Sequence, residues 1–404
     1  MSQFTPVRRA LRHTVAPAML AAAAAAALAG PAAAQSAEPC IGGSWELTGP
    51  LAHIGLQIRY GVEVALDEIN SAGGVLGEEL RLVVYDDVGE PARAVDNALR
   101  IGEQDNCVAM IGGARTPSAI ALREPLHDME MPWLGVISAG SRVLDHEGSE
   151  NVWMFRVGLN DSNVAPFLLQ EALAAAPNNR VAFLHEATAW GQGALPNVER
   201  AFEEAGVELL GVESFNIGDT DMTAQLMRLR DAGVEALVYY GVDAETDAVL
   251  RSMQRLDYSP PLFAAQGIGA QLSETAGPLA DGHRVMGTFS FWGELSEPGQ
   301  RLLDSIIERY DEVTGPRDLL MHSGTASAYD VTHIIARAIE IAGEFDRGKV
   351  RDAFFEVEFE GVNTTFSPAF TEGNHDALSM NEYVMLVFYD GMVLPPEQTP
   401  LGQD

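Results

Sequence analysis

Positive charge is scarce in this sequence of 404 residues, and lysine is almost absent, since Lys349 is the only one. Lysine and arginine together number 25 against 58 acidic residues, which gives a formal net charge of −33 at pH 7. A surface this acidic repels the phosphates of nucleic acids and of anionic lipids. We therefore expect no nucleic-acid partner, and we interpret the acidic excess as a solvated coat.

Cysteine is equally rare, and the two cysteines present suit a structural role. No C-x-x-C and no Cys/His spacing occurs that would indicate a metal or redox site. Cys40 and Cys107 each lie just before a predicted strand. Because the N-terminal ends of parallel strands share one edge of a sheet, we predict a disulfide between these two residues.

The common signatures of catalysis and cofactor binding are also missing. The first strand-to-helix junction reads Thr48-Gly49-Pro50 rather than G-x-G-x-x-G, and Gly267-Ile268-Gly269 lacks the third glycine. There is no P-loop, and Gly135–Gly140 does not have the spacing of a nucleophile elbow. The nine histidines are scattered, without an H-x-H or H-E-x-x-H pattern. We therefore expect no enzyme activity, no cofactor and no metal.

Long apolar runs are missing too, except near the N-terminus. Three arginines within residues 8–12 precede the apolar run Val15–Ala29, and Ala32-Ala33-Ala34 follows as a small-residue cleavage site. The run is shorter than the roughly 20 residues that a membrane span needs. We predict a signal peptide at residues 1–34, cleaved near Ala34, and an exported protein without a membrane anchor.

What the sequence does contain is a regular alternation of short apolar runs and amphipathic segments. In the first run we expect strands at Ile41–Leu47, Leu80–Tyr85, Val108–Ile111 and Trp133–Ile137, with helices at Leu56–Asn70, Ala92–Glu103 and Ser118–Met129. In the second run we expect strands at Val181–His185, Val207–Leu210, Ala236–Tyr240, Leu262–Ala265 and Val285–Phe289. Strands that alternate with helices in this way predict an α/β fold of two similar lobes with parallel sheets.

A cluster of turn residues in the first lobe carries a family resemblance. Its members are Leu47-Thr48-Gly49-Pro50, Gly61, Ala65, Ile69-Asn70-x-x-Gly73-Gly74-Val75-x-Gly77, Tyr85-Asp86-Asp87 and Pro91. Further matches are Ile111-Gly112, Ile137-Ser138, Trp190-Gly191-Gln192-Gly193, Tyr239-Tyr240-Gly241 and Ala328-Tyr329-Asp330. In this order they closely resemble the leucine/isoleucine/valine-binding family, the type I periplasmic solute-binding proteins of ABC transporters. The resemblance extends from about Leu47 to Asp390 and does not specify the ligand.

The resemblance implies an architecture with defined boundaries. Members of the family have two doubly wound, Rossmann-like lobes that the chain connects by three hinge crossings. On that pattern, lobe I comprises residues 38–157 and 291–378, and lobe II comprises residues 158–290 and 379–404.

The resemblance also implies a function without covalent chemistry. The two lobes would close on a small solute, an amino acid or a related carboxylate, and deliver it to an ABC permease in the inner membrane. The protein would then be periplasmic, and we expect it to act as a monomer.

The loops that follow the third and fourth strands are the expected ligand contacts. In the family, the loop here spanning Gly113–Ser118 grips the ligand carboxylate with backbone amides and a hydroxyl, which would be that of Thr116. Ser141 and Arg142 follow in the second contacting segment, and Arg115 or Arg142 would pair with a carboxylate. The alternatives are that Thr116 and Ser141 are helix-cap or turn residues, and that the two arginines only solvate the rim.

The second lobe departs from the family pattern at the positions that face a ligand amine. Trp190 takes the place of an aromatic residue that packs on the ligand, unless it belongs to the core. Gln266 stands where amino-acid binders often carry an acid, and an amide cannot neutralise an ammonium. Asp243 would supply that charge, or would cap the helix Ala244–Leu256 instead. Together with Ile54, which replaces an aromatic residue, these departures leave open another amino acid, an aromatic or aliphatic carboxylate, or an amide.

Two other classes of function remain as alternatives. The same fold can pass its closure to a receptor as a sensor module. An amide hydrolase or another enzyme on this fold would need a nucleophile or a metal set, and the sequence offers neither.

Overall fold

The computed structural model describes residues 1–3, 38–144 and 152–402. Met1–Glu38 form a unit of their own, and everything that follows concerns the compact unit Pro39–Asp404. The predicted signal peptide lies outside the described residues except for residues 1–3. None of the helices in the described ranges has the length and apolar character needed to cross a membrane.

The first sheet is parallel, with the strand order β2-β1-β3-β4-β5. Its strands are β1 (Cys40–Trp45), β2 (Arg81–Asp86), β3 (Ala109–Gly112), β4 (Trp133–Gly135) and β5 (Met154–Arg156). β1 is buried at every position and pairs with β2 on one side and β3 on the other. This is a doubly wound order, in which ligands bind outside the carboxyl ends of the strands where the order reverses.

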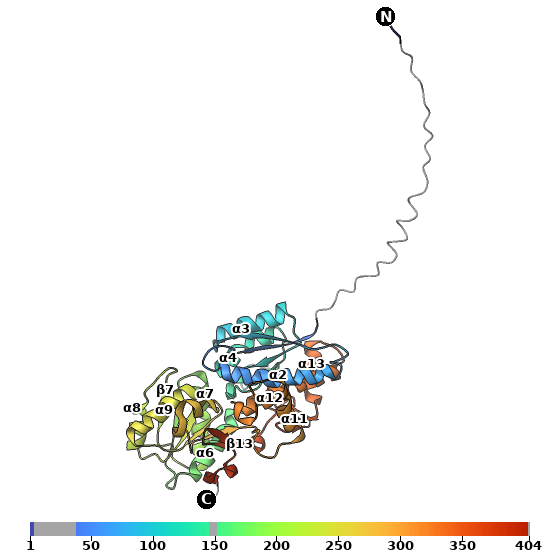
Figure 1. Cartoon of the computed structure of the whole chain (residues 1–404). Coiled ribbons are helices and arrows are strands. Elements are labelled where there is room, and N and C mark those ends of the chain that lie inside the picture. The colour runs from blue at the N-terminus through green and yellow to red at the C-terminus, as the bar shows by residue number, and fades with distance from the viewer. Residues whose placement is uncertain (4–37, 145–151, 403–404) are drawn as a thin grey trace. The chain divides into compact units, whose positions relative to one another are not determined.

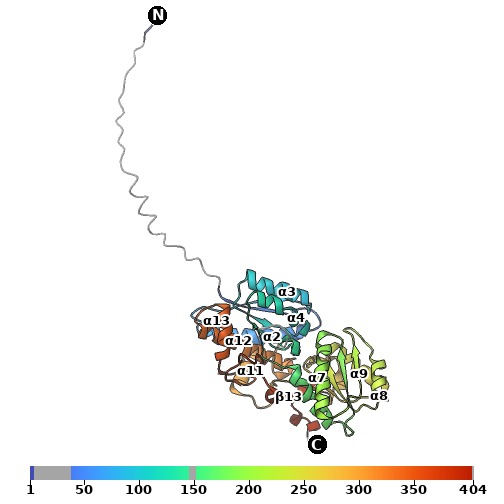
Figure 2. The ribbon, with the colours of Figure 1, turned by 180° about the vertical axis from the view of Figure 1, so that it is seen from behind.

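Helices cover both faces of the first sheet. On one face lie α2 (Ala52–Ser71) and α12 (His322–Ala342), and on the other lie α3 (Pro91–Leu99), α4 (Thr116–Ala121) and α5 (Arg123–Asp128). The blue helix α2 and the orange helix α12 lie side by side although they are far apart in the sequence (Figures 1 and 2). A Cβ on Gly61 of α2 would lie 2.2 Å from the Thr325 carbonyl oxygen of α12, so this close packing requires glycine there.

The second sheet is mixed, with the strand order β14-β13-β10-β9-β8-β6-β7. Its parallel strands are β6 (Val181–Glu186), β7 (Val212–Phe215), β8 (Ala236–Tyr240), β9 (Leu262–Ala264) and β10 (Arg284–Gly287), and its antiparallel strands are β13 (Val384–Tyr389) and β14 (Met392–Leu394). The helices of this lobe are α6 (Asp161–Ala174), α7 (Ala189–Ala205), α8 (Thr223–Asp231), α9 (Asp243–Leu256) and α10 (Gln271–Ala276). In both overall views the green-to-yellow helices α7, α8 and α9 lie together, apart from α2 and α3 (Figures 1 and 2).

The chain passes between the two sheets three times. It leaves the first sheet after β5 and enters α6, returns after β10 into α11 (Glu297–Arg309), and enters the second sheet again at β13. Between α11 and β13 lie α12, α13 (Arg347–Ala353) and a hairpin of β11 (Phe359–Glu360) and β12 (Thr365–Phe366). The predicted fold class, two doubly wound lobes with three crossings, is confirmed, whereas the predicted lobe boundaries stay a prediction.

Two local predictions need correction, and the predicted disulfide is confirmed. The expected strand Val207–Leu210 is wrong, because this segment only leads into the edge strand β7, where Val212 pairs with Phe183. The expected helix Ser118–Met129 is two short helices, α4 and α5, which meet at Leu122. Cys40 and Cys107 are joined by a disulfide, which ties β1 to the residue two positions before β3.

The glycine-rich joint between α2 and β2 is held by side-chain hydrogen bonds. Gly73, Gly74 and Gly77 all have positive φ, which is the conformation that favours glycine. The amide of Asn70 donates to the Leu80 carbonyl and accepts from the Leu80 N–H, at 3.0 and 2.9 Å. This part of the family motif therefore shapes the first lobe.

Arg156, at the end of β5, connects the crossings to the rest of the first lobe. Its guanidinium is fully buried and donates to the Asp376 carboxylate at 2.5 Å and to the carbonyls of Ser138 and Gly140 at 3.2 and 3.1 Å. The other Asp376 oxygen accepts from the side-chain amide of Asn160 at 2.6 Å. One ion pair therefore joins the first crossing, the third crossing and the loop after β4.

We predict that Arg156→Leu destabilises the protein by roughly 3–5 kcal/mol, because it leaves the Asp376 charge unpaired, and Asp376 Oδ1 and two carbonyls without their donor. The free energy of unfolding in urea measures this loss. The matched control is Arg228→Leu, which removes an exposed pair with Glu213 and should have no measurable effect. Equal stability of the Arg156 variant and the control would contradict the structural role assigned to this ion pair.

Candidate binding cleft

A cleft with an empty volume of about 470 Å³, part of it open to solvent, lies between the carboxyl ends of the strands of both sheets. The first lobe lines it with Leu51, Ile54, Ala114, Arg115, Thr116, Pro117, Ile137 and Ala139, and the second with Glu186, Thr188, Trp190, Val242, Gln266 and Gly267. Almost all of these residues end a strand or follow one, which is where open α/β sheets bind ligands. The walls are mainly apolar, with a few polar groups from each lobe.

Thr116 links the two loops that form the first-lobe wall. Its side chain is buried at the start of α4, and its hydroxyl oxygen accepts from the Gly140 N–H at 3.2 Å. A Cβ on Gly140 would lie 2.4 Å from the Thr116 methyl carbon, so the two loops pack tightly. Because its oxygen already accepts one hydrogen bond, the hydroxyl proton of Thr116 can be donated to a bound molecule.

The charge of Arg115 is already paired within the first lobe. Its Nε and Nη2 atoms donate to Glu46 Oε1 at 2.9 and 2.8 Å. The other oxygen of Glu46 accepts from the Leu51 N–H at 2.9 Å, and Glu46 itself is buried. Arg115 therefore lines the cleft as half of an ion pair.

Trp190 forms the aromatic part of the second-lobe wall. Its indole N–H points to Asp161 Oδ1 at 3.4 Å, and its ring centroid lies 5.1 Å from that of Tyr240. Asp161 is fully buried, and this burial raises the pKa of its carboxyl to about 7, although the charge of Arg156 acts in the opposite direction. Trp190 is thus both a cleft residue and a member of the buried core.

Glu186 and Gln266 line the second-lobe side with buried oxygens. The Thr188 hydroxyl donates to Glu186 Oε1, whereas Glu186 Oε2 has no hydrogen-bond partner among the described residues. Gln266 Oε1 lacks a partner in the same part of the chain, and the amide nitrogen of Gln266 makes only a long contact of 3.9 Å to the sulfur of Met321. Burial raises the pKa of Glu186, while Thr188 and the charge of Arg115 lower it and the charge of Glu245 raises it further.

Three of the seven predicted site residues lie outside the cleft lining. The Ser141 hydroxyl donates to Asn160 Oδ1 at 3.1 Å and accepts from the Asn197 amide at 3.0 Å, so it joins the first-lobe loop to α7. Arg142 is exposed beside this contact. Arg115, Thr116, Trp190 and Gln266 line the cleft, and a ligand contact stays a prediction for each of them.

Asp243, the third of these residues, bridges the lobes. Its Oδ1 accepts from the Gly269 N–H at 2.9 Å, and its Oδ2 lies 3.0 Å from His53 Nε2 on α2. The side chains of His53 and Asp243 are only 13% and 6% exposed. Asp243 opens α9, but both of its oxygens bond elsewhere.

Sequence reasoning missed Glu186 and Thr188. The signal was present, because Glu186 directly follows the predicted strand Val181–His185, whose carboxyl end faces the cleft. In so acidic a chain, one more carboxylate at a strand end does not stand out from the sequence alone.

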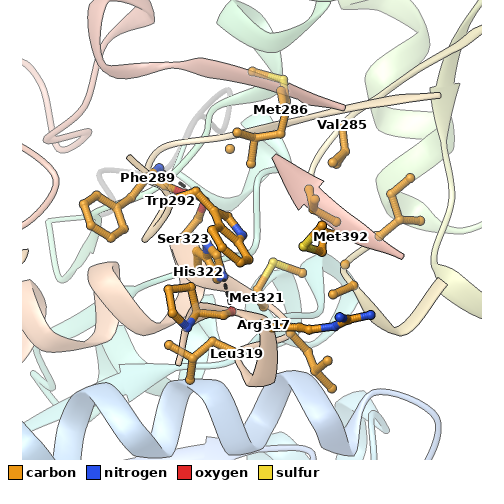
Figure 3. Close-up of a pocket in the computed structure, with 18 of the residues that line it drawn as sticks. Val285, Met286, Phe289, Trp292, Arg317, Leu319, Met321, His322, Ser323 and Met392 are labelled. Carbon is orange, nitrogen blue, oxygen red and sulfur yellow. Dashed lines mark hydrogen bonds between the residues drawn. The ribbon is translucent and has the colours of Figure 1, made fainter. Parts of the chain in front are cut away.

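A second cavity, with an empty volume of about 490 Å³, lies between β10, β14 and the start of α12 (Figure 3). Its labelled side chains are mostly apolar, and Met286, Trp292 and Met392 are among them. His322 is already bonded to the Pro316 carbonyl and the Phe291 N–H, and burial lowers its pKa to about 4. This cavity contains no buried side-chain polar atom that lacks a partner within the described ranges, so we take the cleft as the candidate site.

Comparison with known proteins agrees with this geometry. A family model described as periplasmic binding protein matches residues 40–388. The "Leucine-, isoleucine-, valine-, threonine-, and alanine-binding protein" of Pseudomonas aeruginosa is 27% identical over 315 residues, which are 78% of this chain and 81% of that protein. The "Leu/Ile/Val-binding protein homolog 3" of Brucella melitensis is 28% identical over 328 residues, 81% of this chain and 86% of that protein.

Solved structures share the fold. A type 1 periplasmic binding protein from Bordetella pertussis superposes with a TM-score of 0.79 at 24% identity, covering 87% of this chain and 96% of that chain. The branched-chain amino acid transporter substrate-binding protein LivJ from Streptococcus pneumoniae, solved with isoleucine, gives a TM-score of 0.74 at 22% identity, covering 88% of this chain and 97% of that chain.

The buried Asp161 behind Trp190 predicts a pH dependence of stability. Its folded pKa of about 7 lies above the value of 3.8 for an exposed aspartate, so the folded state binds more protons in this range. Stability should therefore fall as the pH rises from about 4 to 7, by roughly 4 kcal/mol at most from this group. Asp161→Asn should be progressively more stable than the native protein across that range, as measured by urea unfolding. A stability difference that is constant with pH would rule this out.

Proposed function

Because the chain belongs to the leucine/isoleucine/valine-binding family of type I periplasmic binding proteins, we propose that it is the exported solute-binding protein of an ABC importer. It captures a small amino acid or a related carboxylate in the periplasm by closure of its two lobes. It then delivers the solute to a permease in the inner membrane.

The observation that carries this proposal is the position of the cleft, which both lobes line at the carboxyl ends of their strands. A solute there touches both lobes at once, and contacts with both favour the closed arrangement over an open one. The P. aeruginosa relative is named for leucine, isoleucine, valine, threonine and alanine, and the S. pneumoniae protein for branched-chain amino acids. The mainly apolar walls of this cleft suit small side chains of this kind.

We assign the contacts by the chemistry of each wall. Thr116 and the backbone amides of its loop hold the carboxylate, with Arg115 beside them, and Trp190 packs against the apolar part of the solute. Gln266 faces the opposite end of the solute from the second lobe. Direct contacts by Ser141 and Arg142 stay predictions, since neither residue lines the cleft.

A thermal-shift screen of amino acids, aliphatic and aromatic acids, dicarboxylates and amides tests the proposal. A solute at 100 times its Kd should stabilise the protein by about 2.7 kcal/mol. Thr116→Ala should weaken binding of the identified solute by roughly tenfold, while the control Thr116→Ser keeps the hydroxyl and the affinity. If no solute raises the Tm while an ester or amide is hydrolysed, the protein is an enzyme instead.

The contact between His53 and Asp243 joins the lobes and should therefore favour closure. We expect His53→Ala and Asp243→Asn each to weaken solute binding by about 1.5 kcal/mol, or roughly tenfold, and the double variant to be no weaker than either one. Isothermal titration calorimetry measures the three affinities. If Asp243 bonds to the solute itself, Asp243→Asn costs far more than His53→Ala, and the interlobe role of this pair is refuted.

A further inference from the structure

The charges around the cleft do not balance. Arg115 and Glu186 are the charged residues of its lining, and Glu46, behind the lining, already pairs with Arg115. The three side chains therefore sum to one negative charge when all are ionised. Buried charges are normally paired, because an unpaired charge loses its hydration without compensation.

The surplus negative charge lies on Glu186. This residue lies at the carboxyl end of β6 and is 4% exposed. Its Oε1 accepts a hydrogen bond from the Thr188 hydroxyl, whereas its Oε2 has no hydrogen-bond partner among the described residues. Gln266, also 4% exposed, presents a second oxygen that lacks a donor in the described part of the chain. Two buried acceptors in one cleft suit a partner that brings N–H donors, and the ionised carboxylate of Glu186 favours one with positive charge.

Asp243, the acid expected from the sequence to meet an amine, is not available for this task. Both of its oxygens are engaged, by Gly269 and by His53, and it does not line the cleft. The neutral amide of Gln266 supplies an acceptor without a charge. Glu186 is therefore the one lining residue that carries a negative charge.

We propose that Glu186 is the counter-ion of a protonated primary amine on the solute, with the Gln266 oxygen accepting a second N–H of the same group. The inference rests on the proposed function and narrows it. The solute is an amino acid, and a carboxylate without an amine leaves the Glu186 charge unpaired. A solute with a trimethylated nitrogen does not satisfy these two oxygens either, because it has no N–H to donate.

A dependence of affinity on pH follows from the position of Glu186. The charge of Arg115, which is paired with Glu46, acts on Glu186 from the first lobe and the charge of Glu245 acts on it from α9, and His185 is the neighbour of Glu186 on β6. Burial raises the Glu186 pKa, and a bound ammonium favours the ionised form and lowers it. Affinity should therefore fall as the pH falls through the raised pKa of the free protein, and binding near that pH should release a proton.

The test is calorimetry on the mature protein with paired probes. L-leucine, L-isoleucine, L-valine, L-threonine and L-alanine are compared with 4-methylpentanoate, propionate and N,N,N-trimethyl-leucine. At pH 8 we expect at least one amino acid to bind roughly 30-fold or more tightly than its analogue without a primary amine. The affinity of Glu186→Gln for the amino acid should fall by a similar factor, whereas its affinity for the analogue should change little. The glutamine keeps the oxygen that accepts from Thr188, so the local structure is preserved.

Glu245→Gln is the matched control, since Glu245 is buried with one unpartnered oxygen in the described chain but lies outside the cleft lining. The affinity of this variant for the same amino acid at pH 8 should stay within about twofold of the affinity of the native protein. If the Glu186 variant does not fold, proton release by the native protein, measured in buffers of different ionisation enthalpy, decides the question.

The outcomes separate the two proposals. Equal binding of an acid and its amino acid, undiminished binding by Glu186→Gln, or binding without proton release near the Glu186 pKa would overturn the role of Glu186 and leave the solute-binding function intact. Failure of every amino acid and every acid to bind would overturn both.

Discussion

The buried ion pair of Arg156 and Asp376 is the interaction on which the arrangement of this molecule depends. It bonds the end of β5 to the segment that leads into the third crossing, and the same guanidinium holds the carbonyls of Ser138 and Gly140. Gly140 in turn donates to Thr116 in the cleft wall. Because one buried cation connects the hinge to the wall, the first-lobe surface that meets a solute is positioned by the crossings themselves.

Most polar groups near the cleft are committed to partners within the protein. Arg115 is held by Glu46, Ser141 by two amide side chains, and Asp243 by His53 and Gly269. Such fixed groups give the walls a defined shape, and little free energy is lost in ordering their side chains when a solute binds. Among the cleft-lining residues that the structure describes, the buried side-chain atoms without a partner are Oε2 of Glu186 and Oε1 of Gln266, and it is these two atoms that we propose select the solute.

Most of the fold could be predicted from the sequence. For the site, the sequence indicated only which segments after the strands would surround a ligand. Alternating apolar and amphipathic runs predict the two lobes, because central strands such as β1, β6 and β8 are buried along their whole length. The strand predicted at Val207–Leu210 was wrong, because an edge strand such as β7 buries little and gives a weak signal. Thr116 and Trp190 line the cleft because each lies at the start of a helix just after a strand whose carboxyl end faces it, and their contacts with a solute stay predictions. The partner of Asp243 was not predictable, because His53 lies 190 residues away and only packing brings the two together.

The departures from the family pattern make sense when the cleft is considered as a whole rather than position by position. Gln266 stands at a strand end where the family resemblance implies an acid, and a neutral amide there would by itself argue against an amine on the solute. Glu186 supplies a carboxylate at the end of another strand of the same sheet, facing the same cleft. Since Coulomb attraction depends on distance and burial and not on which strand carries the charge, the cleft keeps its negative side although the position of the acid has changed.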